Sequence, residues 1–342
     1  MKSTKIMIEK VKAINPKRLN MLAEKIAKKN NKSVLYVKID MIKNFLKYKI
    51  GYTDYFKSDY INLTKKEKED YVTSRNFFNI LEYLNPREYR VITKDKLVFN
   101  KIFKDYLKRE FIDVRISSEQ EIEKFIKGKN YIFAKPTTDF GGHNIEKIKV
   151  SSIKNINQFK KTLLDNKQYL LEEEIIQHKD FAKLNPNTVN TIRLVTLYND
   201  GKAYLIGNSI RISLDENPAL ACRDLNAKLD ENGNPIGDFV DDDGKIYKLH
   251  PLTGYEFDKF KKVPFEKEAI EMVKEAALKI PELRYIGWDI AITEKGPVLI
   301  EGNEYPSYGL IQNHTLDKNE KGHLKTLREI LGDEINNIKL NK

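Results

Sequence analysis

The stretch 285-YIGWDIAITEKGPVLIEGNEYPS-307 contains two apolar segments that favour β-strands, separated by a short polar turn. We expect strands at Ile286–Ile292 and Pro297–Asn303, because the intervening Glu294–Gly296 includes a glycine that can supply the positive φ of a tight turn. The stretch is therefore predicted to form a β-hairpin. A turn centred on the middle of these three residues would place Asp289 directly opposite Glu301.

The predicted hairpin carries polar side chains that share one face of the sheet. Side chains alternate along a strand, so Asn303 lies on the face of Glu301 and Asp289. Two directly opposed carboxylates repel by roughly 3 kcal/mol at an effective dielectric constant of about 20, and a sheet that keeps them needs a counter-charge. Two carboxylates and an amide oxygen suit Mg²⁺. We interpret these three residues as a metal site; an exposed acidic face or an ion pair with a lysine is the alternative.

The composition is that of a soluble globular protein. The chain has 342 residues, of which 40% are hydrophobic and 32% charged, so it can form two or three subdomains with a sizeable core. Its single cysteine, Cys222, excludes an intrachain disulfide and a cysteine metal cluster, and it suits a reducing compartment. The N-terminal residues lack an apolar segment of signal-peptide length, and there is no run of about 18 apolar residues. We expect a cytoplasmic protein.

Positive charge is concentrated in the N-terminal region. Residues 1–94 contain 22 Lys and Arg against 10 Asp and Glu, whereas the remaining residues contain 39 against 40. Such a region could contact nucleic acid, an anionic membrane surface or an anionic substrate, and a solvated lysine-rich helical surface is the simpler interpretation. Nucleic acid is not expected, because the basic residues are mostly lysines and no nucleic-acid-binding motif accompanies them. At most, we expect weak, salt-sensitive contact with an anionic membrane surface.

The spacing of apolar residues predicts helices and antiparallel strands in mixed order, which indicates an α+β architecture. Asn15 and Pro16 fit the cap and first position of a helix, and Asn199–Gly201 is a strong hairpin turn. We expect a basic helical region at 1–94, a first subdomain at 95–172 and a second subdomain with the metal site at 173–342. Helices are expected at 16–29, 35–46, 65–78, 97–107, 156–164 and 266–280, and further strands at 131–136, 169–172, 191–198 and 202–213.

Several short motifs occur in a characteristic order. From N- to C-terminus they are Asp95-Lys96, Lys135-Pro136 with Gly141-Gly142, Glu172–His178, Val189–Arg193, and Gly287–Ala291 with Glu301–Asn303. In this order they resemble the ATP-grasp superfamily, and most closely its sugar-transfer-associated branch, which is found with cell-surface polysaccharide genes. The resemblance covers roughly residues 95–307. It implies an ATP-grasp fold, in which two α+β subdomains clamp ATP, preceded here by a helical N-terminal region.

The resemblance also implies which residues bind the nucleotide. Lysines near the phosphates, with a Gly-Gly loop, would bind the phosphate oxygens, while a hinge receives adenine and an aspartate binds the ribose hydroxyls. Taken singly, these lysines could equally be surface residues. The implied nucleotide-binding residues are Lys96, Lys135, Gly141, Gly142, Glu173, Ile176 and Asp180.

The resemblance further implies catalytic and metal-binding roles. Arg193 and Arg211 would stabilise negative charge that develops on the γ-phosphate or on an acyl-phosphate, with a surface salt bridge as the alternative for each. Asp289, Glu301 and Asn303 would hold one or two Mg²⁺ ions, with Mn²⁺ as a further option. These are the same three residues that share one face of the predicted hairpin.

The resemblance favours an ATP-dependent carboxylate–amine ligase that forms an amide through an acyl-phosphate and releases ADP. The expected partners are a small-molecule carboxylate and an amine. The family suggests that the carboxylate is a sugar or sugar-linked acid used in polysaccharide biosynthesis. Contact with polysaccharide machinery is a further option. A kinase acting on a sugar or polyol hydroxyl and a non-catalytic ATP-binding scaffold are the alternatives. The chain departs from the family at 212–228, where it lacks the usual glycines near the acceptor site.

Overall fold

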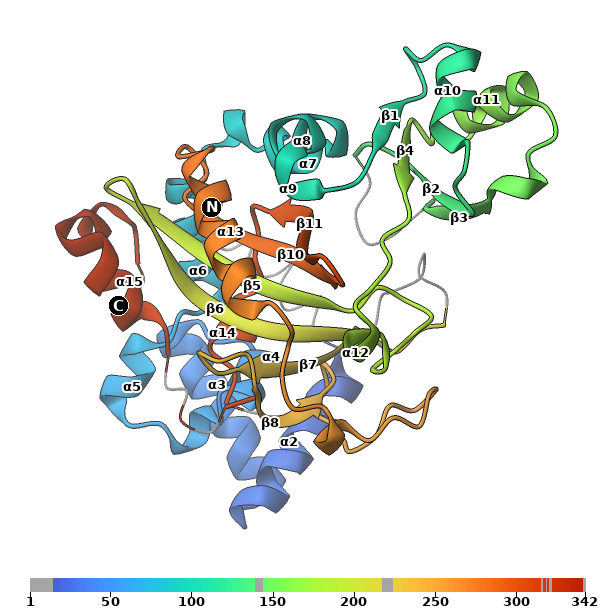
Figure 1. The fold of residues 1–342 in the computed structure, drawn as a ribbon. Helices are drawn as coiled ribbons and strands as arrows, with labels where there is room; N and C mark the ends of the chain where they lie inside the picture. Colours follow the sequence, from blue (N-terminus) through green and yellow to red (C-terminus); the bar gives the residue numbers. More distant parts are fainter. Residues whose placement is uncertain are drawn as a thin grey trace. The chain divides into compact units, whose positions relative to one another are not determined.

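The computed structural model describes residues 15–138, 144–216, 224–314, 316–317, 319 and 322–340 (Figure 1). Contacts divide the chain into two compact units, one formed by residues 1–80 and 312–342 and the other by residues 81–311. The predicted phosphate-loop residues Gly141 and Gly142 lie outside the described residues. Within the described ranges, no helix is both long and apolar enough to cross a membrane.

The first unit is helical, as the sequence predicts. Asn15 caps its first helix: the side chain accepts a hydrogen bond from the backbone N–H of Arg18 at 3.1 Å, and Pro16 occupies the first helical position. The core contains the buried rings of Tyr55, Tyr60 and Tyr71, which pack against one another. The helices are α2 (Pro16–Asn30), α3 (Val34–Tyr48), α4 (Tyr52–Lys57), α5 (Lys65–Asp70), most of α6 (Ser74–Leu84), and α15 (Leu324–Leu331).

The C-terminal residues belong to this helical unit, which differs from the expected assignment of all of 173–342 to one subdomain. The side chain of Gln312 binds both backbone groups of Val72: it accepts from the N–H at 3.0 Å and donates to the carbonyl at 2.5 Å. Arg328 forms an ion pair with Asp70 at 2.6 Å. The unit boundary also falls at residue 80 rather than at the expected residue 94.

The helix expected at 65–78 is interrupted. Tyr71, the residue after α5, is extended with φ −79° and ψ 127°, and α6 begins only at Ser74. The backbone of Val72 uses its hydrogen-bonding groups on Gln312 instead of continuing a helix. A long-range side-chain contact therefore overrides local helical periodicity at this point.

The second unit contains a small antiparallel sheet with strand order β1-β4-β2-β3 among the described residues. Helices α10 (Glu119–Ile126) and α11 (Ile156–Asp165) contribute Ile122, Phe125 and Leu163 to a core shared with its strands. The strands are β1 (Phe111–Asp113), β2 (Tyr131–Lys135), β3 (Glu146–Lys149) and β4 (Leu170–Glu173).

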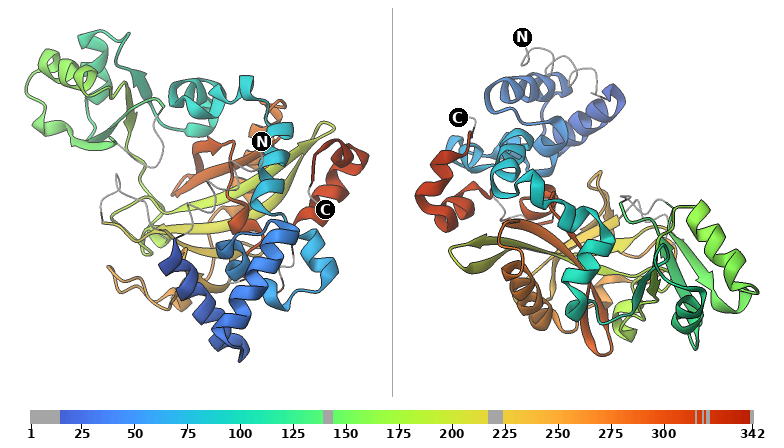
Figure 2. Two further views of the ribbon diagram at one scale, coloured as in Figure 1. Left: turned by 180° about the vertical axis from the view of Figure 1, so that it is seen from behind. Right: turned by 90° about the horizontal axis from the view of Figure 1, so that it is seen from above.

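The unit also contains a larger antiparallel sheet, with order β11-β10-β5-β6-β7-β8-β9 among the described residues. Figure 2 shows the ribbon from two further sides. One face of this sheet carries buried apolar residues such as Trp288, Ile192 and Ile210, which pack with α13 (Glu266–Leu278) in the main core. Because side chains alternate, the opposite face carries polar residues, including Asp289 and Arg193. The strands are β5 (Thr191–Asn199), β6 (Lys202–Ser213), β7 (Asp224–Leu229), β8 (Pro235–Val240), β9 (Ile246–Tyr247), β10 (Tyr285–Thr293) and β11 (Gly296–Asn303).

Short helices accompany these sheets in the sequence, and α12 (Lys179–Ala182) lies between β4 and β5. The helix expected at 97–107 is divided at Phe103 into α8 (Lys96–Ile102) and α9 (Lys104–Leu107). The others are α7 (Val91–Lys94) and α14 (Tyr308–Ile311).

Candidate functional site

The centre of the site is the β10–β11 hairpin, where Asp289 lies directly opposite Glu301 as the sequence predicts. The turn itself would not produce this register. Thr293 pairs with Gly296 and Ile290 with Leu299, and regular continuation would place Asp289 opposite Ile300. A bulge between Asp289 and Ile290 shifts the register by one residue, which brings the two carboxylates onto one face.

Asp289 has a second cross-strand neighbour, Arg193 of β5. The guanidinium binds both carboxylate oxygens, with Nε–Oδ1 at 2.5 Å and Nη2–Oδ2 at 2.7 Å. Arg211 of β6 approaches the same carboxylate at 3.5 Å and also pairs with Asp224 of β7. Two arginines therefore supply positive charge beside the acidic pair. The sequence suggests a lysine as the alternative to a metal ion.

Burial and these neighbours set the protonation preferences of the hairpin. Burial opposes ionisation of Asp289, but the charges of Arg193 and Arg211 outweigh it and lower its pKa. Burial, followed by the charge of Asp289, raises the pKa of Glu301. Burial opposes the charge of Arg211, but Asp289 and Asp224 outweigh it and raise its pKa. One carboxylate of the pair is thus firmly ionised, and the other takes up a proton more readily.

These side chains line a cavity of about 440 Å³ in the second unit. Seven of the residues predicted from the sequence meet there, although they come from six different elements. They are Lys96, Lys135, Arg193, Arg211, Asp289, Glu301 and Asn303.

Glu172 of β4, which opens one of the sequence motifs but was not predicted as a site residue, is buried and also lines this cavity. Its oxygens accept hydrogen bonds from Lys135 at 2.5 Å, Arg109 at 3.0 Å and Asn100 at 2.7 Å. Burial opposes its ionisation, but Arg109 and Lys135 outweigh burial and hold its pKa well below the usual range. The sequence signal was weak, since Glu172 opens a run of three glutamates and nothing distinguishes it locally.

Beside this cavity lies a smaller one of about 160 Å³, to which Glu173 contributes together with Phe133, Ile175 and Val189. The hydroxyl oxygen of Thr188, which also lines this cavity, is buried and has no hydrogen-bond partner. Such a small, mainly apolar space with one unsatisfied polar atom fits a flat heteroaromatic ring.

Two predicted nucleotide-binding residues do not line either cavity. Ile176 is exposed, and Asp180, at the start of α12, forms an ion pair with Lys183 at 2.6 Å. The side chain of His178 caps this short helix by accepting from the N–H of Asp180 at 3.2 Å. The ribose role of Asp180 stays a prediction.

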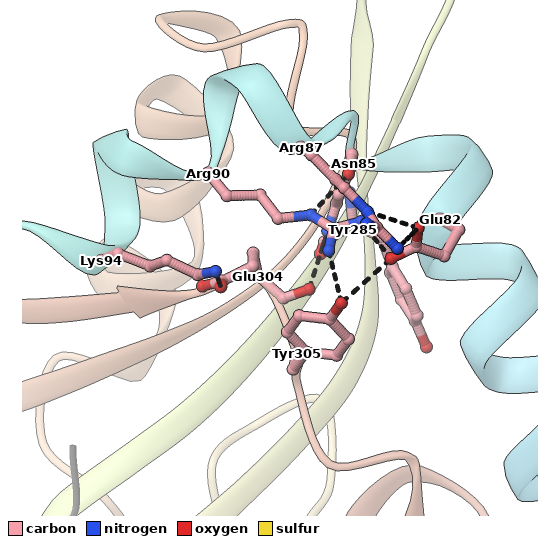
Figure 3. Close-up of polar contacts among 8 residues, drawn as sticks. All are labelled: Glu82, Asn85, Arg87, Arg90, Lys94, Tyr285, Glu304 and Tyr305. Atoms are coloured by element: carbon pink, nitrogen blue, oxygen red, sulfur yellow. Dashed lines mark hydrogen bonds and ion pairs between the residues drawn. The ribbon is translucent and has the colours of Figure 1, made fainter.

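The chain between α6 and α7 is fastened to the end of the hairpin (Figure 3). Asn85 is fully buried and donates to the carbonyls of Tyr285 at 2.8 Å and Glu304 at 2.9 Å, while its amide oxygen accepts from the N–H of Tyr285 at 2.9 Å. The buried Arg90 donates to the carbonyl of Asn85 and to the carboxylate of Glu82, both at 2.8 Å. The bonds of Asn85 to Tyr285 and Glu304 connect residues 200 and 219 positions apart in the sequence.

The same attachment brings two lysines to the cavity. Lys94 lies 3.7 Å from Glu304, which directly follows Asn303. The backbone N–H of Lys96 donates to the carbonyl of Thr137 at 2.8 Å, so this residue also joins the end of β2. Gly302 allows the close approach, because a Cβ atom there would lie 2.9 Å from the ring of Phe99.

The donor set fits a divalent cation and a polyanion. Asp289 and Glu301 offer carboxylate oxygens, although no group of three or more acidic, histidine or cysteine side chains suited to a metal is found among the described residues. The amide nitrogen of Asn303 donates to both carboxylates, at 3.4 and 3.2 Å, so its oxygen would become a ligand after a half-turn of the amide. Five cationic side chains line the same cavity and suit phosphate groups.

The family model described as sugar-transfer associated ATP-grasp matches residues 78–325. No curated protein matches the chain. Among solved structures, it is similar to the ATP-grasp ligase PsnB complexed with minimal precursor (14% identity, 65% of this chain, 56% of that chain, TM-score 0.38). It is also similar to D-alanyl-alanine synthetase A from Vibrio cholerae (12% identity, 70% of this chain, 64% of that chain, TM-score 0.40). A third similar structure is the D-cycloserine synthetase DcsG (12% identity, 72% of this chain, 73% of that chain, TM-score 0.41). The chain thus spans little more than half of PsnB.

Proposed function

Since this chain belongs to the sugar-transfer associated ATP-grasp family, we propose that it is an ATP-dependent ligase that joins a carboxylate to an amine. The family match confirms the resemblance seen in the sequence motifs, and with it the ATP-grasp fold preceded by helices. The proposed reaction consumes ATP and forms an amide, with ADP and inorganic phosphate as the other products.

The observation that carries this proposal is the arrangement of charge around the 440 Å³ cavity. Lys96, Lys135 and Arg211 supply positive charge beside the acidic pair of the hairpin. Phosphoryl transfer depends mainly on positioning and on electrostatic stabilisation, and it requires no nucleophilic side chain from the protein. The residues of the cavity therefore suit this chemistry.

The proposed reaction has two steps. A carboxylate oxygen of the acid substrate attacks the γ-phosphorus of ATP, the bond from that phosphorus to the β–γ bridging oxygen breaks, and ADP leaves. The amine nitrogen then attacks the carbonyl carbon of the resulting acyl-phosphate. The carbon–oxygen bond to the phosphate breaks, the nitrogen loses a proton, and inorganic phosphate leaves with the amide formed.

The two arginines would contribute differently. The side chain of Arg193 is only 8% exposed and is held by both oxygens of Asp289, so we assign it to fixing that carboxylate. The side chain of Arg211 is 27% exposed and makes a longer contact with Asp289, so it can reach the transferring phosphoryl group and stabilise its negative charge.

Asp289, Glu301 and Asn303 would hold Mg²⁺. When bound, Mg²⁺ would offset the charge of the phosphate oxygens and orient them for in-line transfer. The 160 Å³ cavity would receive the adenine ring, with Thr188 offering its unsatisfied hydroxyl group.

For the acid substrate, we propose a sugar or a sugar-linked carboxylate used in building cell-surface polysaccharide. The support is the family description, which refers to sugar transfer. The size of the cavity is compatible with a small-molecule acceptor beside the phosphates.

The test is ADP release from MgATP in the presence of pooled sugar and amino-acid carboxylates, with and without pooled amines. We expect release that needs both pools. Glu301→Gln should abolish it, whereas Glu282→Gln, a matched change at an exposed position, should not. Release with hydroxyl compounds alone would replace the ligase by a kinase. MgATP binding without release under any condition would instead support a non-catalytic scaffold.

A further inference from the structure

Helix α3 carries a row of large aliphatic side chains on its solvent-exposed side. Leu35, Ile39, Ile42 and Leu46 are between 45% and 68% exposed. Their spacing places all four within an arc of about 60° on an α-helix. The periodicity that predicted this helix from the sequence therefore arises from its outer face, while Val37 and Met41 bury the inner face.

Lysines border this row. Lys43 and Lys47 each follow a residue of the row by one position, lie one turn apart and are exposed. Lys38 lies on the other side of the row and reaches Asn20 at 2.6 Å. The one acidic residue in the α3 sequence, Asp40, faces away: its carboxylate accepts from Asn44 at 2.9 Å and from the hydroxyl of Tyr55.

We infer that the outer face of α3 docks the protein on the surface of an anionic lipid membrane. An apolar row bordered by lysines is the arrangement that lets a helix lie in a membrane interface, with its aliphatic groups among the acyl chains and its ammonium groups at the lipid phosphates. The unit that contains α3 carries 25 Lys and Arg against 13 Asp and Glu, whereas residues 81–311 carry 36 against 37. The net positive charge that attracts an anionic surface is thus carried by the unit with the exposed row.

Charge also argues against two other occupants of this face. A second copy of the chain packed through the same face would bring its own lysine border against that of the first, and like charges repel. Residues 1–14 carry four lysines and one glutamate, so they too would bring like charge to the lysine border. An anionic lipid surface meets both the apolar and the cationic part of the face.

The test is flotation of the full chain with phosphatidylcholine vesicles, with and without about one-third phosphatidylglycerol. We expect flotation only with the anionic vesicles, and less of it at high salt. The pair Ile39→Gln/Ile42→Gln should weaken binding at least tenfold, and Lys43→Gln/Lys47→Gln about tenfold. The charge-matched control Lys65→Gln/Lys325→Gln, at exposed positions of the same unit, should change binding less than threefold.

Circular dichroism of each variant distinguishes loss of docking from loss of folding. The inference is overturned by equal flotation with neutral vesicles, by the absence of flotation, or by full binding of the folded Ile39→Gln/Ile42→Gln variant. It is also overturned if the wild type is a dimer in solution and this variant is a monomer, because the face would then be a self-interface. ADP release by the unattached variant is independent of these outcomes and continues to test the ligase separately.

Discussion

The guanidinium of Arg193 binds both carboxylate oxygens of Asp289, although the two residues are 96 positions apart in the sequence. They lie directly opposite each other on β5 and β10, and both are buried. This contact keeps Asp289 ionised beside Glu301, whose pKa is raised. The hairpin therefore presents two carboxylates that differ in their readiness to bind a proton.

Replacing Arg193 with Met should destabilise the fold, because it leaves the buried Asp289 without its bidentate partner. We expect the free energy of unfolding in urea to fall by about 3–5 kcal/mol. The double variant Arg193→Met/Asp289→Asn removes both charges and should be more stable than the single variant. Equal stabilities of the single and double variants would show that the ion pair does not carry the effect.

The affinity for MgATP should fall at acidic pH because of Glu301. Its raised pKa means that it becomes protonated at a higher pH than an ordinary glutamate, and the protonated form is a poor metal ligand. Calorimetric titration across pH should show weakening that begins above the usual titration range of glutamate. The Glu301→Gln variant should bind MgATP weakly at every pH. If it instead keeps the pH profile of the wild type, Glu301 is not the metal ligand that titrates.

Glu172→Gln should destabilise the protein at neutral pH, since Arg109 and Lys135 would lose their shared buried counter-charge. The expected loss is about 3 kcal/mol. The pKa of Glu172 is lowered in the folded state, so its stabilisation is complete above the usual value of 4.5 and is lost as pH falls below it. The stability difference between wild type and variant should therefore shrink in acid; a constant difference from pH 7 to pH ~3 would contradict this.

Asn85→Leu should lower both stability and activity. It removes three buried hydrogen bonds to the ends of the hairpin and leaves their backbone partners unsatisfied, at a cost of about 3 kcal/mol or more. Thermal unfolding measures the first effect, and the KM for ATP measures the second, through the displaced Lys94 and Lys96. Arg87→Ala nearby, at an exposed ion pair with Glu82, should change stability by less than about 1 kcal/mol.

The elements of the metal-site hairpin could be predicted because their determinants are local. Turn residues and the alternation of apolar and polar side chains predict the two strands and place Glu301 and Asn303 on one face of the second, whereas the register that sets Asp289 opposite Glu301 also needs the bulge. The same reasoning predicts the cap at Asn15 and the hairpin at Asn199–Gly201, both of which the structure contains. Each of these features depends on residues close together in the sequence.

Other features depend on residues that only the folded chain brings together. The partners of Asp289 and Glu172, the attachment of Val72 to Gln312, and the bulge beside Ile290 were not predictable from local patterns. Periodicity predicted α3 but not which of its faces is buried, because both faces are apolar and only packing against neighbouring helices distinguishes them. The sequence by itself thus determined strands, turns and the alternation of side chains along each strand. Tertiary structure decided the bulged register and the counter-charges, since ion pairs form between distant segments whose approach is set by packing of the core.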